Sequence, residues 1–157
     1  PAAPLPISDY LEPISDEEFA RCGGKKRSIA FNMVGGDGLT QSSGNQSNNP
    51  QLQRSNSIIQ NVILDAVEEW TVLNFNGLSQ PFHIHVNPMY VTKLNGEAIK
   101  PYWCDTVALP AGGTLENPTS ITFRMRFSDF VGPYILHSQM LQYSDLGMVQ
   151  RVTVVPV

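Results

Sequence analysis

The chain has 157 residues, of which 41% are apolar, and this size and composition suit one domain with a single packed core. Ten Lys and Arg residues against 14 Asp and Glu residues give a net charge of −4, so the basic face that phosphate backbones require is missing and nucleic acid is not an expected partner. No apolar run approaches the roughly 18 to 20 residues that cross a bilayer, so no transmembrane segment is predicted. The chain begins at Pro1 without a signal-like segment, and we expect a mature or excised piece of a longer protein.

Charged residues make up only 15% of the chain, and 12 Gly and 12 Pro residues put many turns into a short sequence. This profile favours an all-β domain over a helical one. It also favours an extracytoplasmic location, either secreted, periplasmic or at the cell surface.

The first 20 residues contain four prolines and mostly acidic charge, which predicts an extended arm with one helical turn at 15–19. The domain itself is expected to span 21–157. Within it, residues 35–57 consist almost entirely of Gly, Ser, Asn and Gln, which predicts a long polar loop. That loop contains the one glycosylation acceptor pattern, at Asn45, a weak three-residue match.

Short runs of apolar and β-branched residues recur at regular spacing and are separated by Asn-Gly, Pro and Gly turn signals. Such a pattern predicts a β-sandwich. The predicted strands are 27–33, 58–64, 69–74, 82–86, 89–95, 106–109, 120–127, 132–138 and 148–155.

The two cysteines, Cys22 and Cys104, are far apart in the sequence and belong to no C-x-x-C pair. A zinc site or a thioredoxin-like site is therefore not predicted. Both cysteines precede predicted strands, and we expect one Cys22–Cys104 disulfide, which would fit an oxidising compartment.

Two of the three histidines, His83 and His85, are two residues apart on a predicted strand. Residues at this spacing face the same side of a sheet, so both imidazoles are expected on one face. Taken alone, such a pair can simply be two polar residues on a wet sheet face. The third histidine, His137, ends another predicted strand that leads into a loop closing with Gly147-Met148.

These two segments resemble the C-terminal cupredoxin domain of the multicopper oxidases, the family of laccases and related metal oxidases. The family's first motif reads H-P-x-H-x-H and its second reads H-C-H-x-x-x-H-x-x-x-G-M. Residues 80–85 and 137–148 align with these motifs without a gap. The resemblance implies a cupredoxin-like Greek-key β-sandwich and a copper-dependent oxidoreductase ancestry.

The resemblance also implies roles for the histidines. His83 matches a ligand of the type 2 copper, and His85 matches a ligand of one type 3 copper. His137 matches a second ligand of the same type 3 copper. Imidazole is a suitable copper ligand, so the resemblance implies a partial copper site. In the complete enzymes the remaining ligands come from an N-terminal domain.

The sequence departs from the family motifs at the type 1 copper site, where electrons enter. Gln80, Ser138 and Tyr143 stand where the family has the two type 1 histidines and the cysteine, and of the usual set only Met148 is retained. Gln139 replaces a type 3 histidine. A blue copper site needs a thiolate, so these departures imply that the type 1 site is lost and that the isolated chain is not an active oxidase.

Three functions follow as alternatives. The domain can be a structural or protein-interaction module in which the histidines are relics, or a copper-binding module that uses His83, His85 and His137. It can also be the C-terminal part of an oxidase whose electron entry and other ligands come from other domains or chains. The loss of the type 1 ligands favours the structural or interaction module. The copper-binding module ranks only slightly lower, because every histidine of the chain is at a copper position. The expected partners are other cupredoxin domains of the same precursor or further copies of the chain.

Overall fold

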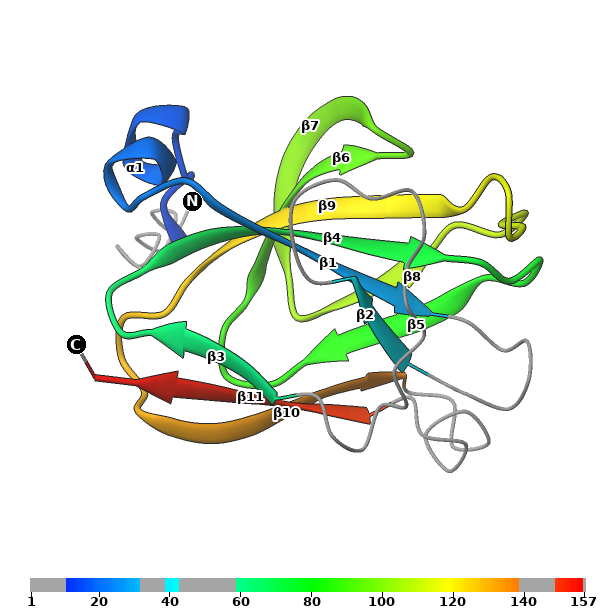
Figure 1. Ribbon diagram of the computed structural model, residues 1–157. Helices are drawn as coiled ribbons and strands as arrows, with labels where there is room; N and C mark the ends of the chain where they lie inside the picture. The colour runs from blue at the N-terminus through cyan, green and yellow to red at the C-terminus, as the bar shows by residue number, and fades with distance from the viewer. Residues whose placement is uncertain (1–10, 32–38, 43–58, 139–148, 157) are drawn as a thin grey trace, which may run out of the picture.

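The computed structural model describes residues 11–31, 39–42, 59–138 and 149–156, and in these ranges the chain is almost entirely β-structure. One short helix, α1, precedes the strands (Figure 1). The elements are α1 (Asp16–Arg21), β1 (Lys25–Phe31), β2 (Leu39–Ser42), β3 (Ile59–Ile63), β4 (Val67–Asn74), β5 (Gln80–Ile84), β6 (Met89–Leu94), β7 (Glu97–Cys104), β8 (Thr106–Leu109), β9 (Thr119–Arg126), β10 (Gly132–Ser138) and β11 (Val149–Val155).

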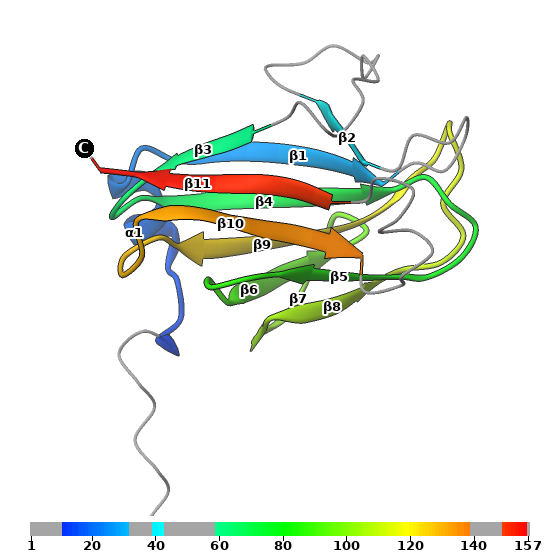
Figure 2. The ribbon, with the colours of Figure 1, turned by 90° about the horizontal axis from the view of Figure 1, so that it is seen from below.

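The strands form two sheets that stack face to face (Figures 1 and 2). The six-stranded sheet has the order β2-β1-β4-β9-β6-β7, and the five-stranded sheet has the order β3-β11-β10-β5-β8. Two pairs are parallel, β1 with β4 and β3 with β11, and the other pairs are antiparallel. The chain passes repeatedly between the sheets, for example from β4 to β5 and back to β6. The expected all-β sandwich is confirmed.

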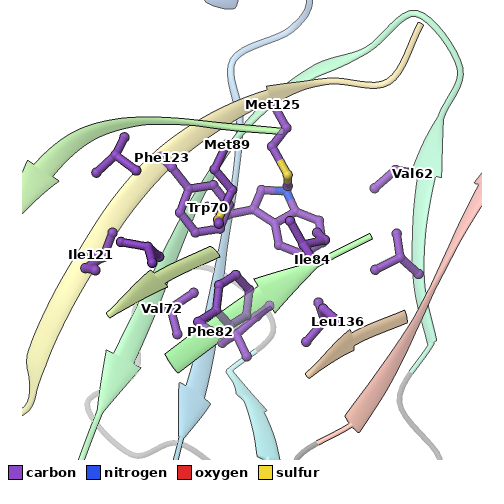
Figure 3. Packing of buried hydrophobic residues seen from close by; sticks show 14 of the residues in the cluster. Val62, Trp70, Val72, Phe82, Ile84, Met89, Ile121, Phe123, Met125 and Leu136 are labelled. Carbon is purple, nitrogen blue, oxygen red and sulfur yellow. The ribbon is translucent and has the colours of Figure 1, made fainter. Parts of the chain in front are cut away.

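The core lies between the two sheets and is built by the alternation of inward and outward side chains. Trp70 of β4 and Phe123 of β9 come from one sheet, Phe82 of β5 comes from the other, and all three are 0% exposed (Figure 3). The rings of Phe82 and Phe123 meet across the sandwich with their centroids 5.7 Å apart. Removing such side chains from water is the main force that holds the two sheets together.

Nine predicted strands are found, and two of them, β8 and β10, match to the residue. The structure adds two strands that the sequence did not predict. β2 lies inside the segment 35–57 that was expected to be loop, and it pairs with β1. β7 contains Pro101 and shows no apolar alternation because it is an edge strand, exposed along much of its length.

The N-terminal segment is not simply an extended arm, because its described part docks on the domain. Ser15 caps α1 by accepting a hydrogen bond from the Glu18 N–H at 3.1 Å. Phe19 of α1 packs with Ile14 and Val67 in a small apolar cluster beside the six-stranded sheet. The helical turn expected at 15–19 is found as α1, which extends to Arg21 and lies against the domain.

The expected Cys22–Cys104 disulfide is wrong for this structure, since both cysteines are free. Cys22 packs against the small apolar cluster under α1, whereas Cys104 packs against the main core. Burial raises the pKa of the Cys104 thiol to about 11, so this thiol stays protonated at neutral pH. In the described part of the chain, we find no helix with the length and apolar character of a membrane span.

Candidate metal centre

The five-stranded sheet brings the three histidines together on its outer face. His83 lies on β5 and is paired in register with His137 on the neighbouring strand β10. His85 follows β5 directly, and its backbone N–H donates to the Ile135 carbonyl of β10 at 3.1 Å. Because residues two apart share a face, the pairing of β5 with β10 is sufficient to place all three imidazoles side by side.

The three rings face one another closely. Their centroids are 4.8 Å apart for His83 and His85, 5.4 Å for His83 and His137, and 5.2 Å for His85 and His137. One nitrogen from each ring lies within 4.8 Å of the other two, and all three residues are half-buried. The closest contact is 3.1 Å, between the Nε2 atoms of His85 and His137. These two are the histidines that the family resemblance assigns to one copper ion.

Hydrogen bonds determine which nitrogen of two of the rings carries the proton. His83 Nδ1 lies 2.9 Å from the Asp105 carbonyl, and His137 Nδ1 lies 2.8 Å from the Ser138 carbonyl. A carbonyl oxygen can only accept, so Nδ1 is the donor in both rings. In the neutral state, the Nε2 atoms of His83 and His137 are therefore unprotonated and carry a lone pair, as a metal ligand must.

The pKa of His85 is lowered from its ordinary value of 6.5, first by desolvation and then by the neighbouring His83 and His137. A lowered pKa keeps this imidazole neutral at neutral pH. A neutral ring can donate one Nε2–H to the unprotonated Nε2 of His137, which explains their short contact without a metal. A cation can occupy the same place once that proton leaves.

The chain turns sharply after His85. Val86 has a φ of 67°, which is unusual for a β-branched residue, and the Asn87 N–H donates back to the His85 carbonyl at 2.8 Å. Asn87 is buried, and its side-chain amide donates to the carbonyl of Arg126, the last residue of β9, at 2.8 Å. This tight turn holds the backbone of His85 at the end of β5.

Two of the residues that the resemblance aligns with type 1 ligands, Gln80 and Ser138, are described by the structure, and both face the core. Gln80 and Ser138 are 1% and 0% exposed, and they alternate with the outward-facing His83 and His137 along β5 and β10. In the described part of the chain, Oε1 of Gln80 has no hydrogen-bond partner. The other predicted positions, Gln139, Tyr143 and Met148, lie outside the described residues, as does Asn45.

The donor set was tested against the requirements of a metal ion. Two imidazole nitrogens bound to one ion at about 2.0 Å each, with a tetrahedral angle between them, are about 3.3 Å apart. The His85–His137 separation of 3.1 Å is close to this value. The ligand nitrogen of His83 completes the set, within 4.8 Å of those of the other two rings. Imidazole nitrogens suit copper and zinc, so the residues fit the metal that the family uses.

Comparison with known proteins agrees with the fold. A family model described as multicopper oxidase matches residues 25–157. The chain therefore belongs to the multicopper oxidase family. A comparison with curated protein sequences finds no significant match.

Several solved structures share the fold. A laccase from Pediococcus acidilactici aligns with 22% identity and a TM-score of 0.66, over 98% of this chain and 31% of that one. A multicopper oxidase from Pseudomonas thermotolerans aligns with 18% identity and a TM-score of 0.67, over 98% and 33%. A multicopper oxidase from Campylobacter jejuni aligns with 23% identity and a TM-score of 0.57, over 85% and 30%. The chain thus spans about a third of the length of these enzymes, with a cupredoxin-like β-sandwich.

Sequence reasoning did not identify the groups that hold His83. Thr106 was predicted only as the first residue of a strand, 106–109, yet its Oγ1 lies 2.8 Å from His83 Nδ1. The two residues are partners across β5 and β8. The pairing of two strands that are separated by β6 and β7 in the chain is the signal that a single sequence lacks.

Proposed function

We propose that this domain binds one copper ion on the outer face of its five-stranded sheet, with His85 and His137 as the principal ligands and His83 as the third. The observation that carries the proposal is the 3.1 Å separation of the His85 and His137 Nε2 atoms. Two further observations support the proposal, since only neutral imidazole binds a metal. The Nε2 atoms of His83 and His137 are unprotonated in the neutral rings, and the pKa of His85 is lowered. Copper bound there supplies a one-electron acceptor.

We further propose that the domain has lost its type 1 copper site. A blue site needs a cysteine thiolate, and Ser138 offers a hydroxyl while Gln80 offers an amide. Both side chains lie in the core, on the opposite side of their strands from the histidines. The isolated chain therefore has no route for electron entry and is not expected to oxidise phenolic or ferrous substrates.

The test is copper titration of the purified chain. We expect one tightly held Cu²⁺ per chain and no intense thiolate absorption in the visible. H85A and H137A should each abolish this binding, and H83A should weaken it, because the closest nitrogen pair, His85 Nε2 and His137 Nε2 at 3.1 Å, remains when His83 is removed. The chain has three histidines, so the triple variant H83A/H85A/H137A contains none and measures adventitious copper binding. Unchanged stoichiometry in both H85A and H137A, or an intense blue band, would contradict the proposal.

A second candidate function, that of an interaction module, is favoured by the same face. Large apolar side chains are exposed on it, namely Ile63 of β3 at 48% and Ile135 of β10 at 39%, and Val86, next to His85 in the chain, is 48% exposed. Ile135 precedes His137 by two residues on β10 and so shares its face. Exposed apolar side chains around a polar site are typical of protein interfaces. We propose that the partner is another cupredoxin domain of the same precursor or a second copy of this chain.

The two functions are separable by experiment. If the chain binds no copper but associates through this face, the histidines are relics and the interaction function stands alone. If copper binding and association occur together, the third alternative gains support, in which the domain is the C-terminal part of an oxidase. If the chain binds no copper in the titration and remains a 17.3 kDa monomer in light scattering, this result would count against both functions. An extracytoplasmic location remains part of the proposal.

A further inference from the structure

The chain crosses from one sheet to the other directly beside the histidine cluster. β7 ends in the six-stranded sheet at Cys104, and β8 begins in the five-stranded sheet at Thr106. Asp105 is the single residue between them. This corner places a main-chain carbonyl and a hydroxyl next to the ring of His83.

The Asp105 carbonyl and the Thr106 hydroxyl act on the same atom of His83. The carbonyl oxygen lies 2.9 Å from Nδ1, and Thr106 Oγ1 lies 2.8 Å from Nδ1. The carbonyl also accepts the Ile84 N–H at 3.2 Å, which fixes the carbonyl to β5. Because the carbonyl requires Nδ1 to be the donor, the Thr106 hydroxyl also serves as an acceptor of the Nδ1 proton.

Among the three histidines, only His83 has its Nδ1 held by another side chain in the described part of the structure. The Nδ1 of His137 donates to the carbonyl of the adjacent residue Ser138, and the Nε2 of His85 lies against the Nε2 of His137. The orientation of this ring therefore depends on the corner more than on the metal site itself.

We infer that Thr106 is a positioning residue for the metal centre. Its hydroxyl, together with the Asp105 carbonyl, holds His83 in the Nδ1–H tautomer and points Nε2 toward His85 and His137. Partners of this kind fix the tautomer and direction of metal-binding histidines, and their removal commonly costs about 10- to 100-fold in metal affinity. This inference rests on the proposed copper site for its second readout and on the metal-free protein for its first.

The first readout is the tautomer of His83 in the metal-free protein, from the ¹⁵N chemical shifts of its ring. In the wild type we expect well-separated shifts, with Nδ1 protonated and Nε2 unprotonated. T106V keeps the shape and β-branching of the side chain but removes one of the two acceptors of the Nδ1 proton, so the two shifts should move part of the way toward each other as the Nε2–H tautomer gains population. T106S restores the hydroxyl and should restore the wild-type shifts.

The second readout is the dissociation constant for Cu²⁺. T106V should weaken binding about tenfold, the lower end of the usual range, because the Asp105 carbonyl remains. T106S should bind as the wild type does. The matched control is T92V, which removes a hydroxyl that donates to the Thr122 carbonyl in the six-stranded sheet, and it should change neither readout.

The two readouts separate failure of this inference from failure of the copper site. Wild-type ¹⁵N shifts in T106V would overturn the inference whether or not copper binds. Shifted ¹⁵N signals with unchanged copper affinity would overturn the role of Thr106 in the metal site. A wild-type protein that binds no copper would refute the proposed function, and the ¹⁵N shifts would still decide whether Thr106 positions His83.

Discussion

A buried ion pair between Glu68 and Arg27 lies in the six-stranded sheet, and Arg27 connects this pair to the other sheet. Removing the carboxylate charge tests how far this connection holds the sandwich together. Glu68 of β4 is 1% exposed and accepts hydrogen bonds from Arg27 Nε at 2.6 Å and from Trp70 Nε1 at 2.8 Å. Arg27 lies on β1 and also donates to Gln60 of β3, in the other sheet, at 3.0 Å. The side chain of Arg27 is itself only 12% exposed. Glu68 thus neutralises a cation that would otherwise be buried between the sheets.

The substitution E68Q keeps the shape of the side chain and removes its charge. Breaking a buried ion pair by changing one partner costs about 3 to 5 kcal/mol. Arg27 retains its bonds to Gln60 and to the Asn61 carbonyl, so we expect the lower end, about 3 kcal/mol. For a chain of this length each kcal/mol lowers Tm by about 2 to 4 °C, which gives a fall of about 6 to 12 °C.

The assay is thermal and urea unfolding of the metal-free protein, followed by circular dichroism. E97Q, at an exposed position of β7, is the matched control and should lie within about 0.5 kcal/mol of the wild type. The double variant R27M/E68Q should be more stable than E68Q alone, because it also removes the unpaired cation. An E68Q protein within about 0.5 kcal/mol of the wild type would show that the Arg27–Glu68 pair does not hold the sheets together.

Two further predictions concern the cysteines and the N-terminal helix. Alkylation after unfolding without reductant should label both Cys22 and Cys104, and a mass corresponding to an unlabelled, oxidised chain would contradict the free thiols. The side-chain hydrogen bond from Arg126 lowers the pKa of Glu18 from its ordinary value of 4.5. Because the pKa is lower in the folded state, this bond stabilises the docked helix above pH 4.5. The stabilisation is lost as the pH falls through the folded-state pKa. Hydrogen exchange of the α1 amides should therefore accelerate in acid. In E18Q these amides should exchange fast already at neutral pH. The control variant E17Q changes an exposed position of the same helix, and its amides should exchange as in the wild type.

The local features of the sheet could be predicted from the sequence because they depend on neighbouring residues. β8 and β10 were predicted to the residue, since each is a short apolar run bounded by turn-forming residues. The shared face of His83 and His85, and the opposite direction of Ser138 relative to His137, follow from the two-residue period of a strand. The family motifs were recognisable for the same reason, because each is a contiguous segment.

Features that depend on which strands pair could not be predicted. β2 and β7 have no apolar alternation of their own, and they are strands because β1 and β6 offer them hydrogen-bonding edges. The expected disulfide was wrong because Cys22 and Cys104 are placed against different apolar clusters. No local pattern in the sequence specifies either outcome.

The metal centre itself shows the same division. The two-residue spacing of His83 and His85 is enough to put them on one face of a strand, and the family resemblance indicated that His137 belongs with them. Only the tertiary structure decided that His85 and His137, 52 residues apart, meet with their Nε2 atoms in contact, and that Thr106 and the Asp105 carbonyl hold His83. The physical reason is the register between β10, β5 and β8, because a one-residue slip in that pairing would turn the side chains of a strand to the other face.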